Sequence, residues 1–193
     1  MAELLLVRHG ETDWNRERRF QGHADPPLNE TGRTQALALA DHLAGEAIDA
    51  LYTSDLARAR ETAEILAARL GVEVVPLREL REIDVGEWQG LTWPEIEERF
   101  PEGARAWRER HHGWETGETY EELAERVVPA LRRIAVAHTG GRAVVVAHGG
   151  TVRATRAFIA GTSVADSRRL DRAIRNCEIF RIAVEDGRFR RID

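Results

Sequence analysis

Short apolar runs alternate along the chain with longer segments in which apolar residues recur at helical spacing. A continuous apolar run of a few residues is typical of a buried strand, whereas recurrence every three to four positions is typical of an amphipathic helix. The expected strands are residues 3–8, 48–54, 72–77 and 142–148. The expected helices are residues 33–45, 55–71, 119–138 and the stretch from the glycine pair 149–150 to Ile159.

Capping residues and glycines predict where two of these helices begin and end. Asn29 or Thr31 is expected to cap the first helix, which should end at Gly45. The second helix is expected to be capped near Ser54 and to end at Gly71. These boundaries leave each expected strand followed by its own helix.

Two regions depart from this alternation. Residues 93–112 are charged and rich in tryptophan, and Pro94 and Pro101 should break them into short helices. Residues 176–192 contain Asp186-Gly187, a dipeptide that favours a tight hairpin turn. We therefore expect a small helical insertion and a C-terminal hairpin.

Strands that alternate with helices predict an α/β fold, a three-layer α/β/α sandwich with a mostly parallel central sheet and a small helical lid insertion. No repeat or linker divides residues 1–193, so we expect a single domain with its lid at about 93–118. His9 ends one apolar strand and His148 ends another. Because ligand sites form beyond the carboxyl ends of parallel strands, both histidines should lie at the same sheet edge.

Composition narrows the classes of partner and compartment. The net charge of −5 argues against a nucleic-acid partner, and no apolar stretch is long enough to span a membrane. Cys177 is the only cysteine, so no internal disulfide forms and a cytoplasmic location is expected. All 28 basic residues are arginine. The absence of lysine excludes a lysine Schiff base and the lysine-bearing phosphate loop.

Two arginines and two histidines are expected at this edge of the sheet. Arg8 and His9 leave the first strand, His148 leaves a later one, and Arg58 lies in the first turn of the helix after residues 48–54. Arginine grips two phosphate oxygens with its planar fork. A neutral histidine can attack phosphorus and form a phosphohistidine, which splits one difficult displacement into two.

Phosphoryl transfer also needs an acid that protonates the departing alcohol. Chemistry and spacing leave four carboxylates open for this role, and they are Glu79, Glu82, Asp84 and Glu87. Metal assistance is not expected. His111 and His112 are adjacent and point apart, and no carboxylate-histidine spacing of metal-ligand type accompanies His23.

Five sequence blocks follow one another in order: RHGET with Asn15, QGHADPPL, YTSDLARARETA, LREIDVGEWQG and VVVAHGG. Together they resemble the histidine phosphatase superfamily, in its phosphoglycerate mutase-like branch. The resemblance extends from Leu4 to about Thr151 and thins in residues 99–116 and in the C-terminal hairpin.

The resemblance implies a role for each matching position. His9 is the phosphorylated nucleophile, and Glu82 is the proton donor. Residues that hold the phosphoryl group are Arg8, Arg58, His148 and Asn15. Residues expected to contact the phosphate or the substrate are Gln21, Gly22 and, through its backbone N–H, Gly149. Asn176 is either a residue that supports the site or a polar group that begins a strand.

The same comparison favours a phosphatase over a mutase. Mutases of this branch resemble ERHYG where this chain has EIDVG, so Ile83 and Val85 replace the arginine and tyrosine that grip a substrate carboxylate. Mutases also tend to have a lysine in place of Trp93 and carry a longer insertion, and Gln21 is a further departure toward phosphatases. The expected function is a phosphomonoesterase without metal or cofactor. A cofactor-dependent phosphoglycerate mutase and a non-catalytic phospho-ligand-binding protein are the alternatives.

The substrate is expected to be a small-molecule phosphate ester selected by the lid at 93–118. Arg105, Arg108 and Arg110 either meet a second anionic group of the substrate or form a solvated charged face. If these arginines meet a second anionic group, a phosphorylated sugar acid, a 3-phosphoglycerate derivative or phosphoserine would suit them as substrate. A ribazole phosphate or a broad range of esters is the other possible substrate. Relatives of this branch are often dimers, so the resemblance also implies a homodimer.

Overall fold

The computed structural model describes residues 1–109, 111–166 and 173–193. A six-stranded sheet in the order β3-β2-β4-β1-β5-β6 forms its centre. Strands β3, β2, β4 and β1 are parallel, and β5 and β6 continue the sheet in antiparallel pairing. The strand bounds are β1 Ala2–Arg8, β2 Ala50–Thr53, β3 Val74–Pro76, β4 Arg142–Ala147, β5 Ile179–Glu185 and β6 Arg188–Arg191.

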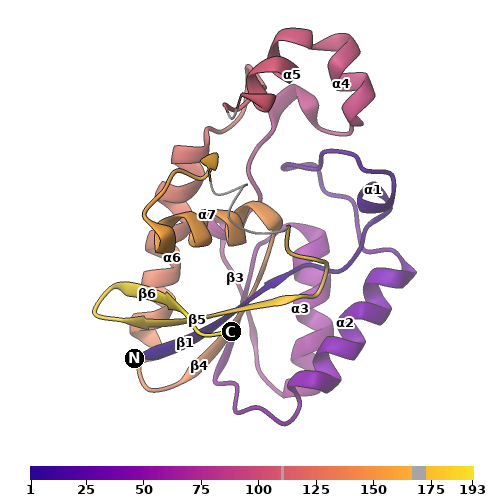
Figure 1. Ribbon diagram of the computed structural model, residues 1–193. Helices are drawn as coiled ribbons and strands as arrows, with labels where there is room; N and C mark the ends of the chain where they lie inside the picture. Colours follow the sequence, from indigo (N-terminus) through magenta and orange to yellow (C-terminus); the bar gives the residue numbers. More distant parts are fainter. Residues whose placement is uncertain (110, 167–172) are drawn as a thin grey trace.

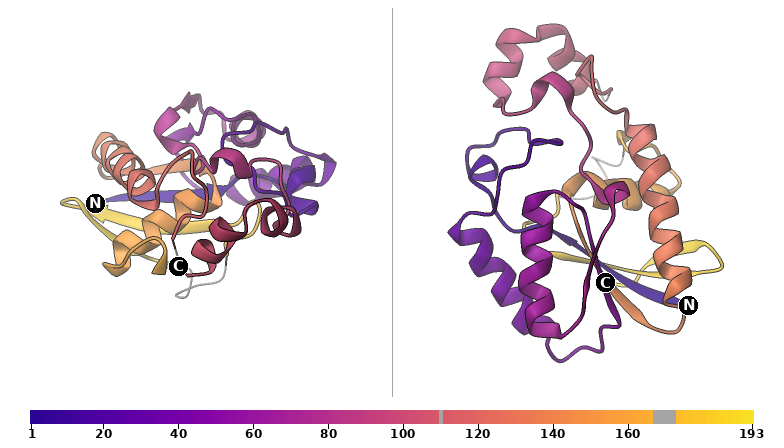
Figure 2. Two further views of the ribbon diagram at one scale, coloured as in Figure 1. Left: turned by 90° about the horizontal axis from the view of Figure 1, so that it is seen from above. Right: turned by 180° about the vertical axis from the view of Figure 1, so that it is seen from behind.

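Helices cover both faces of the sheet (Figures 1 and 2). Helices α2 and α3 lie against one face, and α6 and α7 lie against the other. Their bounds are α2 Glu30–Leu43, α3 Ala57–Leu70, α6 Tyr120–Ala137 and α7 Gly149–Ala160. The predicted three-layer α/β/α fold with a mostly parallel sheet is therefore confirmed.

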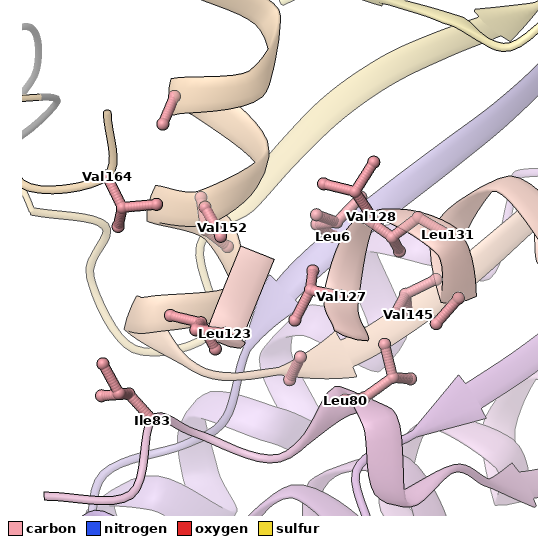
Figure 3. Packing of buried hydrophobic residues seen from close by; sticks show 14 of the residues in the cluster. Leu6, Leu80, Ile83, Leu123, Val127, Val128, Leu131, Val145, Val152 and Val164 are labelled. Atoms are coloured by element: carbon pink, nitrogen blue, oxygen red, sulfur yellow. The ribbon is translucent and has the colours of Figure 1, made fainter. Parts of the chain in front are cut away.

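The side chains of β1 alternate between two hydrophobic clusters. Leu5 and Val7 pack with α2 and α3, whereas Leu4 and Leu6 pack with α6 and α7. Figure 3 shows the second cluster, in which Leu6 of β1 is drawn close to Val127 and Val128 of α6. A strand buried on both faces reads as a continuous apolar run, which explains the pattern in residues 3–8. Burial of this kind contributes about 25 cal/mol per Å² of apolar surface and holds the strand ends rigidly.

The predicted start of α2 is confirmed, whereas its predicted end and the predicted N-cap of α3 are wrong. Helix α2 ends at Leu43 with Ala44 as its C-cap, so Gly45 lies beyond the helix. Asn29 caps α2, and its side chain accepts a hydrogen bond from the Gly32 N–H at 2.8 Å. Helix α3 ends at Gly71, which has the left-handed conformation. Its N-cap is Leu56 rather than Ser54, and the carboxylate of Asp25 accepts from the Ala57 N–H at 2.6 Å. A residue from a distant loop thus supplies the cap, which the local sequence could not indicate.

The insertion beyond the carboxyl edge of the sheet contains two short helices, α4 Trp93–Arg99 and α5 Pro101–Arg108 (top of Figure 1). Both prolines lie in the first turn of a helix, where a missing N–H costs nothing. Short segments elsewhere on this edge are α1 Asp13–Arg16, η1 Arg78–Leu80 and η2 Gly86–Trp88. Among the described residues, no helix combines the length and apolar character needed to cross a membrane.

The C-terminal hairpin turns at Asp186 and Gly187, as predicted. Their φ angles are +49° and +73°, so both central residues are left-handed, as a type I′ turn requires. The hairpin adds β5 beside β1, where it places the preceding segment with Asn176 next to the end of β1. This segment thereby becomes part of the carboxyl edge described next.

Candidate active site

The parallel register brings the ends of β1 and β4 level with each other. Arg8 pairs with Ala147, and the His9 N–H donates to the Ala147 carbonyl at 3.0 Å. The residues that follow these strands, His9 and His148, therefore lie side by side, with ring centroids 5.2 Å apart. Their exposed fractions are 2% and 0%. Two buried histidines thus lie together at the carboxyl edge of the sheet, as the strand topology predicts.

A backbone carbonyl fixes the tautomer of His9. Nδ1 lies 2.7 Å from the Gly10 carbonyl oxygen, which can only accept a hydrogen bond, so Nδ1 carries the proton. Burial, followed by the charges of Arg58 and Arg8, holds the pKa of His9 well below its usual value. His9 is therefore a neutral imidazole with its lone pair on Nε2, the form in which histidine is a nucleophile.

The backbone after His9 packs tightly against its neighbours. A Cβ on Gly10 would lie 2.5 Å from the Gly32 carbonyl oxygen, so only glycine fits there. The Gly10 N–H donates to Thr62 Oγ1 at 3.0 Å. Glu11 points toward the start of α2, where its carboxylate accepts from Asn29 Nδ2 at 3.0 Å. Glu11 is therefore turned away from His9 despite its adjacency in sequence.

Arg58 is fully buried, with an exposed fraction of 0%. Its two terminal nitrogens donate to the carbonyls of Gly22 and Ala24, each at 2.8 Å. Desolvation by burial lowers the pKa of Arg58 to about 10, while the charge of Glu82 acts in the opposite direction. The loop that contains Gly22 thus orients a guanidinium that remains cationic at neutral pH.

Arg8 is anchored in a similar way from the other side. Its Nη1 donates to the Ile174 carbonyl at 2.8 Å, and burial lowers its pKa. Among the described residues, the buried Nε atoms of Arg8 and Arg58 and both ring nitrogens of His148 have no hydrogen-bond partner. Buried polar groups are normally paired, so their convergence indicates a site built for an anionic ligand.

His148 begins α7 and faces His9. Burial, followed by the charge of Arg58, holds its pKa well below the usual value. Gly149 starts the helix and lines the same cavity. The positive end of the α7 dipole therefore adds to the two guanidinium groups.

Two asparagines connect the loop after β1 with the segment before β5. Asn176 Nδ2 donates to the His9 carbonyl at 2.9 Å and to Asn15 Oδ1 at 3.2 Å. Asn15 Oδ1 also accepts from the Thr12 N–H at 3.1 Å. Since its oxygen is occupied, the amide nitrogen of Asn15 is the group left for the cavity that it lines. Asn176 therefore lies in the supporting position rather than simply beginning a strand.

Glu82 lies across the cavity at the start of α7. Its carboxylate accepts from the N–H groups of Ile83 and Gly150, both at 2.9 Å. A Cβ on Gly150 would lie 2.0 Å from Glu82 Oε1, so the glycine makes room for the carboxylate. Of the four carboxylates left open by the sequence, only Glu82 lines this cavity.

The three other carboxylates have different partners within the described residues. Glu79 forms an ion pair with Arg133. Asp84 accepts from the Gly86 N–H at 3.0 Å. Glu87 accepts from backbone N–H groups of the lid segment at 2.7 and 3.0 Å. Their positions leave Glu82 as the acid candidate on geometric grounds.

The candidate site residues line a cavity of about 410 Å³. Gln21 and Gly22 line one side of it, together with the candidates already described. Its apolar wall comes from Phe20, Ile83, Val85, Trp107, Trp114, Tyr120 and Leu123. The cavity therefore joins a cationic floor to an aromatic upper part. Such a shape suits a phosphate ester whose organic portion points toward the lid.

Sequence reasoning missed Arg153, which lines the cavity from α7. Its position one helical turn after Gly149 places it on the same helix face, and that spacing could have indicated it. The lid arginines lie elsewhere: Arg105 pairs with Glu102, and Arg108 pairs with Glu97 and stacks over a tryptophan ring. Neither lines the cavity. Arg110 is outside the described residues.

The comparison with known families agrees with this geometry. A model described as "Histidine phosphatase superfamily (branch 1)" matches residues 4–192. The chain belongs to this superfamily. The match includes the lid and the hairpin, where the sequence resemblance is thin. The predictions of the family and of a phosphoric monoester hydrolase are therefore confirmed.

Three relatives illustrate the range within the histidine phosphatases. Phosphoglycerate mutase-like protein 4 of Arabidopsis thaliana is 45% identical over 79% of this chain and 68% of its own. The metal-independent phosphoserine phosphatase of the same plant is 43% identical over 80% and 67%. The solved structure of a mycobacterial glucosyl-3-phosphoglycerate phosphatase with VO3 has a TM-score of 0.88 and 34% identity, and covers 98% and 96% of the two chains.

Proposed function

We propose that this histidine phosphatase hydrolyses phosphomonoesters through a phosphohistidine at His9. The observation that carries the proposal is the imidazole of His9, which is buried, neutral and protonated on Nδ1. Its Nε2 lone pair is therefore available among two guanidinium groups that would hold the phosphoryl oxygens. Charge on those oxygens is stabilised by Arg8, Arg58, His148, Asn15 and the N-terminus of α7.

The reaction proceeds in two displacements. His9 Nε2 attacks phosphorus, the bond between phosphorus and the ester oxygen breaks, and Glu82 gives its proton to the departing alkoxide. Water then attacks the phosphohistidine, and the Glu82 carboxylate accepts the proton of that water. Inorganic phosphate leaves, and His9 and Glu82 return to their initial forms. The cationic side chains take the place that a metal ion has in other phosphatases.

Labelling with a radioactive phosphate ester tests the nucleophile. Rapid quenching should trap a label on the protein that is stable in base and labile in acid, and turnover should persist in EDTA. His9→Ala should abolish both the label and the turnover, because it removes the Nε2 that is proposed to attack phosphorus. A label that survives in His9→Ala would refute the assignment. Absence of any turnover by the native chain would favour a phospho-ligand-binding protein.

Hydrolysis is favoured over mutase activity by the residues around the cavity. Ile83 and Val85 line it and offer no group that would grip a substrate carboxylate at those positions. Several relatives nevertheless are named phosphoglycerate mutase or phosphoglycerate mutase-like. Incubation with 3-phosphoglycerate and 2,3-bisphosphoglycerate separates the two reactions, and we expect free phosphate to exceed the isomer product.

We further propose that the substrate is a phosphorylated carboxylic acid. Two relatives are named for phosphoserine and for glucosyl-3-phosphoglycerate, which both carry a carboxylate. Arg153 is half-buried in the cavity and has no hydrogen-bond partner among the described residues. Its charge also acts on Arg8, which lies close to the phosphate position. A carboxylate near the scissile phosphate would pair with this guanidinium.

The Arg153→Met variant tests this substrate class. Its kcat/KM for phosphoserine and 3-phosphoglycerate should fall by about 10- to 100-fold, which is the usual effect of losing one hydrogen bond to a charged group. Phosphoethanolamine and glycerol phosphate have no carboxylate and should be hydrolysed nearly as before. An equal loss on all four esters would show that Arg153 does not recognise the carboxylate.

The segment 93–118 is proposed to be the specificity lid, because Trp107 and Trp114 form part of the apolar wall. We also propose a cytoplasmic location, because the chain has a single cysteine and so forms no internal disulfide. Burial raises the pKa of Cys177 to about 12, so the thiol stays protonated and unreactive.

A further inference from the structure

Arg126 of α6 uses all of its N–H donors to bind the segment around Glu82. Nη1 donates to the carbonyls of Glu79 and Arg81 at 2.9 and 2.7 Å, and Nη2 donates to the carbonyl of Glu82 at 2.8 Å. Nε and Nη2 also donate to the two carboxylate oxygens of Glu118, at 2.5 and 2.6 Å. A guanidinium has five N–H groups, and every one has a partner here.

Glu118 completes the attachment from the segment that leads into α6. Its carboxylate accepts from the Asp84 N–H at 3.3 Å, and its own N–H donates to the Asp84 carbonyl at 2.9 Å. The Arg126 and Glu118 side chains are 21% and 14% exposed, so solvent screens this pair only partly. The backbone is therefore held on both sides of Glu82, before it at Arg81 and after it at Asp84.

A second group binds the same carbonyl from the opposite loop. His23 Nε2 donates to the Glu82 carbonyl at 2.9 Å, and His23 Nδ1 lies 3.6 Å from Asp84 Oδ2. His23 follows Gly22, whose carbonyl holds Arg58. The backbone of Glu82 is thus fixed between α6 and the loop that orients the buried arginine.

We propose that Arg126, paired with Glu118, is a positioning residue for proton transfer by Glu82. Arg126 lines a separate surface cavity behind the segment and does not line the active-site cavity. Its hydrogen bonds therefore reach the site through the backbone of Glu82, and, besides burial, its charge, which Arg126→Lys keeps, also helps to lower the pKa of His148. With that backbone fixed, the Glu82 carboxyl is confined to the space over Gly150. The inference rests on the proposed role of Glu82 as the acid.

The physical reason for arginine at this position is the geometry of its donors. Three carbonyls and a bidentate carboxylate surround a planar group, and only a guanidinium matches them together. Lysine keeps the charge but has three donors on one atom, so it leaves carbonyls unpaired. Arg126→Lys should therefore release the backbone of Glu82, although the positive charge at residue 126 is kept.

The dependence of the rate on the leaving group provides the test. An aryl phosphate with an acidic phenol departs without a proton, whereas an alkyl phosphate needs the acid. We expect Glu82→Gln to lower kcat/KM, which reports the phosphorylation step and not the later hydrolysis of the phosphohistidine, by about 100-fold or more on glycerol phosphate and far less on p-nitrophenyl phosphate. Arg126→Lys and Arg126→Met should show the same selectivity, with a loss of about 10-fold or more on the alkyl ester.

Arg133→Met is the matched control. Arg133 lies on the same helix and pairs with the side chain of Glu79, but it does not bind the backbone carbonyls next to Glu82. Its variant should retain wild-type rates on both esters. Glu118→Gln provides a second variant if Arg126 substitutions fold poorly, because it weakens the same pair and keeps an oxygen acceptor.

The outcomes separate the two claims. Equal losses on both esters in folded Arg126 and Glu118 variants would reduce Arg126 to a structural role and overturn the inference. Wild-type rates on both esters in those variants would overturn it as well. If Glu82→Gln itself shows no selectivity, the acid assignment fails and the inference fails with it, while the phosphohistidine label at His9 would still stand.

Discussion

At the residue scale, the site depends on charged and polar groups that are buried without a carboxylate in contact among the described residues. Arg8 and Arg58 have lowered pKa values because of burial, and each is anchored by backbone carbonyls rather than by an acid. A carboxylate partner would neutralise the guanidinium and compete with the substrate. Carbonyls orient the group and leave its charge for the phosphate that it is proposed to bind.

Arg58→Lys tests whether orientation matters as well as charge. The fork that binds the Gly22 and Ala24 carbonyls is lost, so kcat/KM should fall by about 10- to 100-fold. Arg60→Lys on the exposed side of the same helix is the control and should change little. Steady-state kinetics on one ester suffices, and wild-type kcat/KM in Arg58→Lys would contradict a role for the planar fork.

At the element scale, the first turn of α7 has three functions at once. His148 caps it, Gly149 lines the cavity, and the Gly150 N–H binds Glu82. The helix follows directly from β4, so the sheet fixes its start relative to His9. The position of the acid thus depends on one strand-to-helix junction and on the backbone hydrogen bonds to Arg126.

Gly150→Ala should separate activity from stability. The new Cβ would meet the Glu82 carboxylate, the flexible end of a side chain, which would move away. Alkyl phosphate hydrolysis should fall by about 10-fold or more because the acid is displaced. The free energy of unfolding should stay the same or rise by up to about 1 kcal/mol, because alanine favours helix more than glycine does.

Gly45→Ala is a suitable comparison, since a Cβ there meets nothing within 4 Å. Both its activity and its urea midpoint should match the native chain. If Gly150→Ala hydrolyses alkyl phosphates at the native rate, the carboxylate over that glycine is not the acid.

At the scale of the whole molecule, the fold stabilises two histidines in their neutral forms. Burial and neighbouring arginines lower the folded-state pKa of His9 and His148 below the value of about 6.5 expected for an unfolded chain. The unfolded state therefore binds more protons than the folded state between those values. The sign follows from linkage: the free energy of unfolding decreases as the pH falls below about 6.5.

Urea unfolding between pH 7.5 and 5.5 measures this effect. Each histidine should contribute up to about 1.4 kcal/mol per pH unit once the pH is below 6.5. Replacement of both by asparagine should flatten that part of the profile. Inorganic phosphate should raise the free energy of unfolding of the native chain as its concentration exceeds its Kd for the folded state. An unchanged slope in the double variant would show that other groups cause the acid sensitivity.

The homodimer implied by the family resemblance and the division into one domain with a lid remain predictions at this scale. Sedimentation of the chain at several concentrations would measure its state of association. Limited proteolysis would report whether residues 93–118 are cut before the sheet region.

The sequence by itself determined the fold class and the meeting of His9 with His148. Continuous apolar runs require strands buried on both faces, and parallel strands deliver the residues that follow them to one edge. It also placed the cap of α2 at Asn29 or Thr31 and a turn at Asp186-Gly187, because these depend on local backbone chemistry. The ordered motif blocks indicated the histidine phosphatase superfamily.

The tertiary structure decided between groups that the chemistry of the sequence left open around those histidines. Chemistry left four carboxylates open, and the position of Gly150 beside Glu82 distinguishes one of them. Arg153 of α7 lines the cavity, whereas the described lid arginines Arg105 and Arg108 do not. The five hydrogen bonds of Arg126 join segments far apart in sequence. Local patterns specify elements, whereas contacts between elements depend on packing that no single segment encodes.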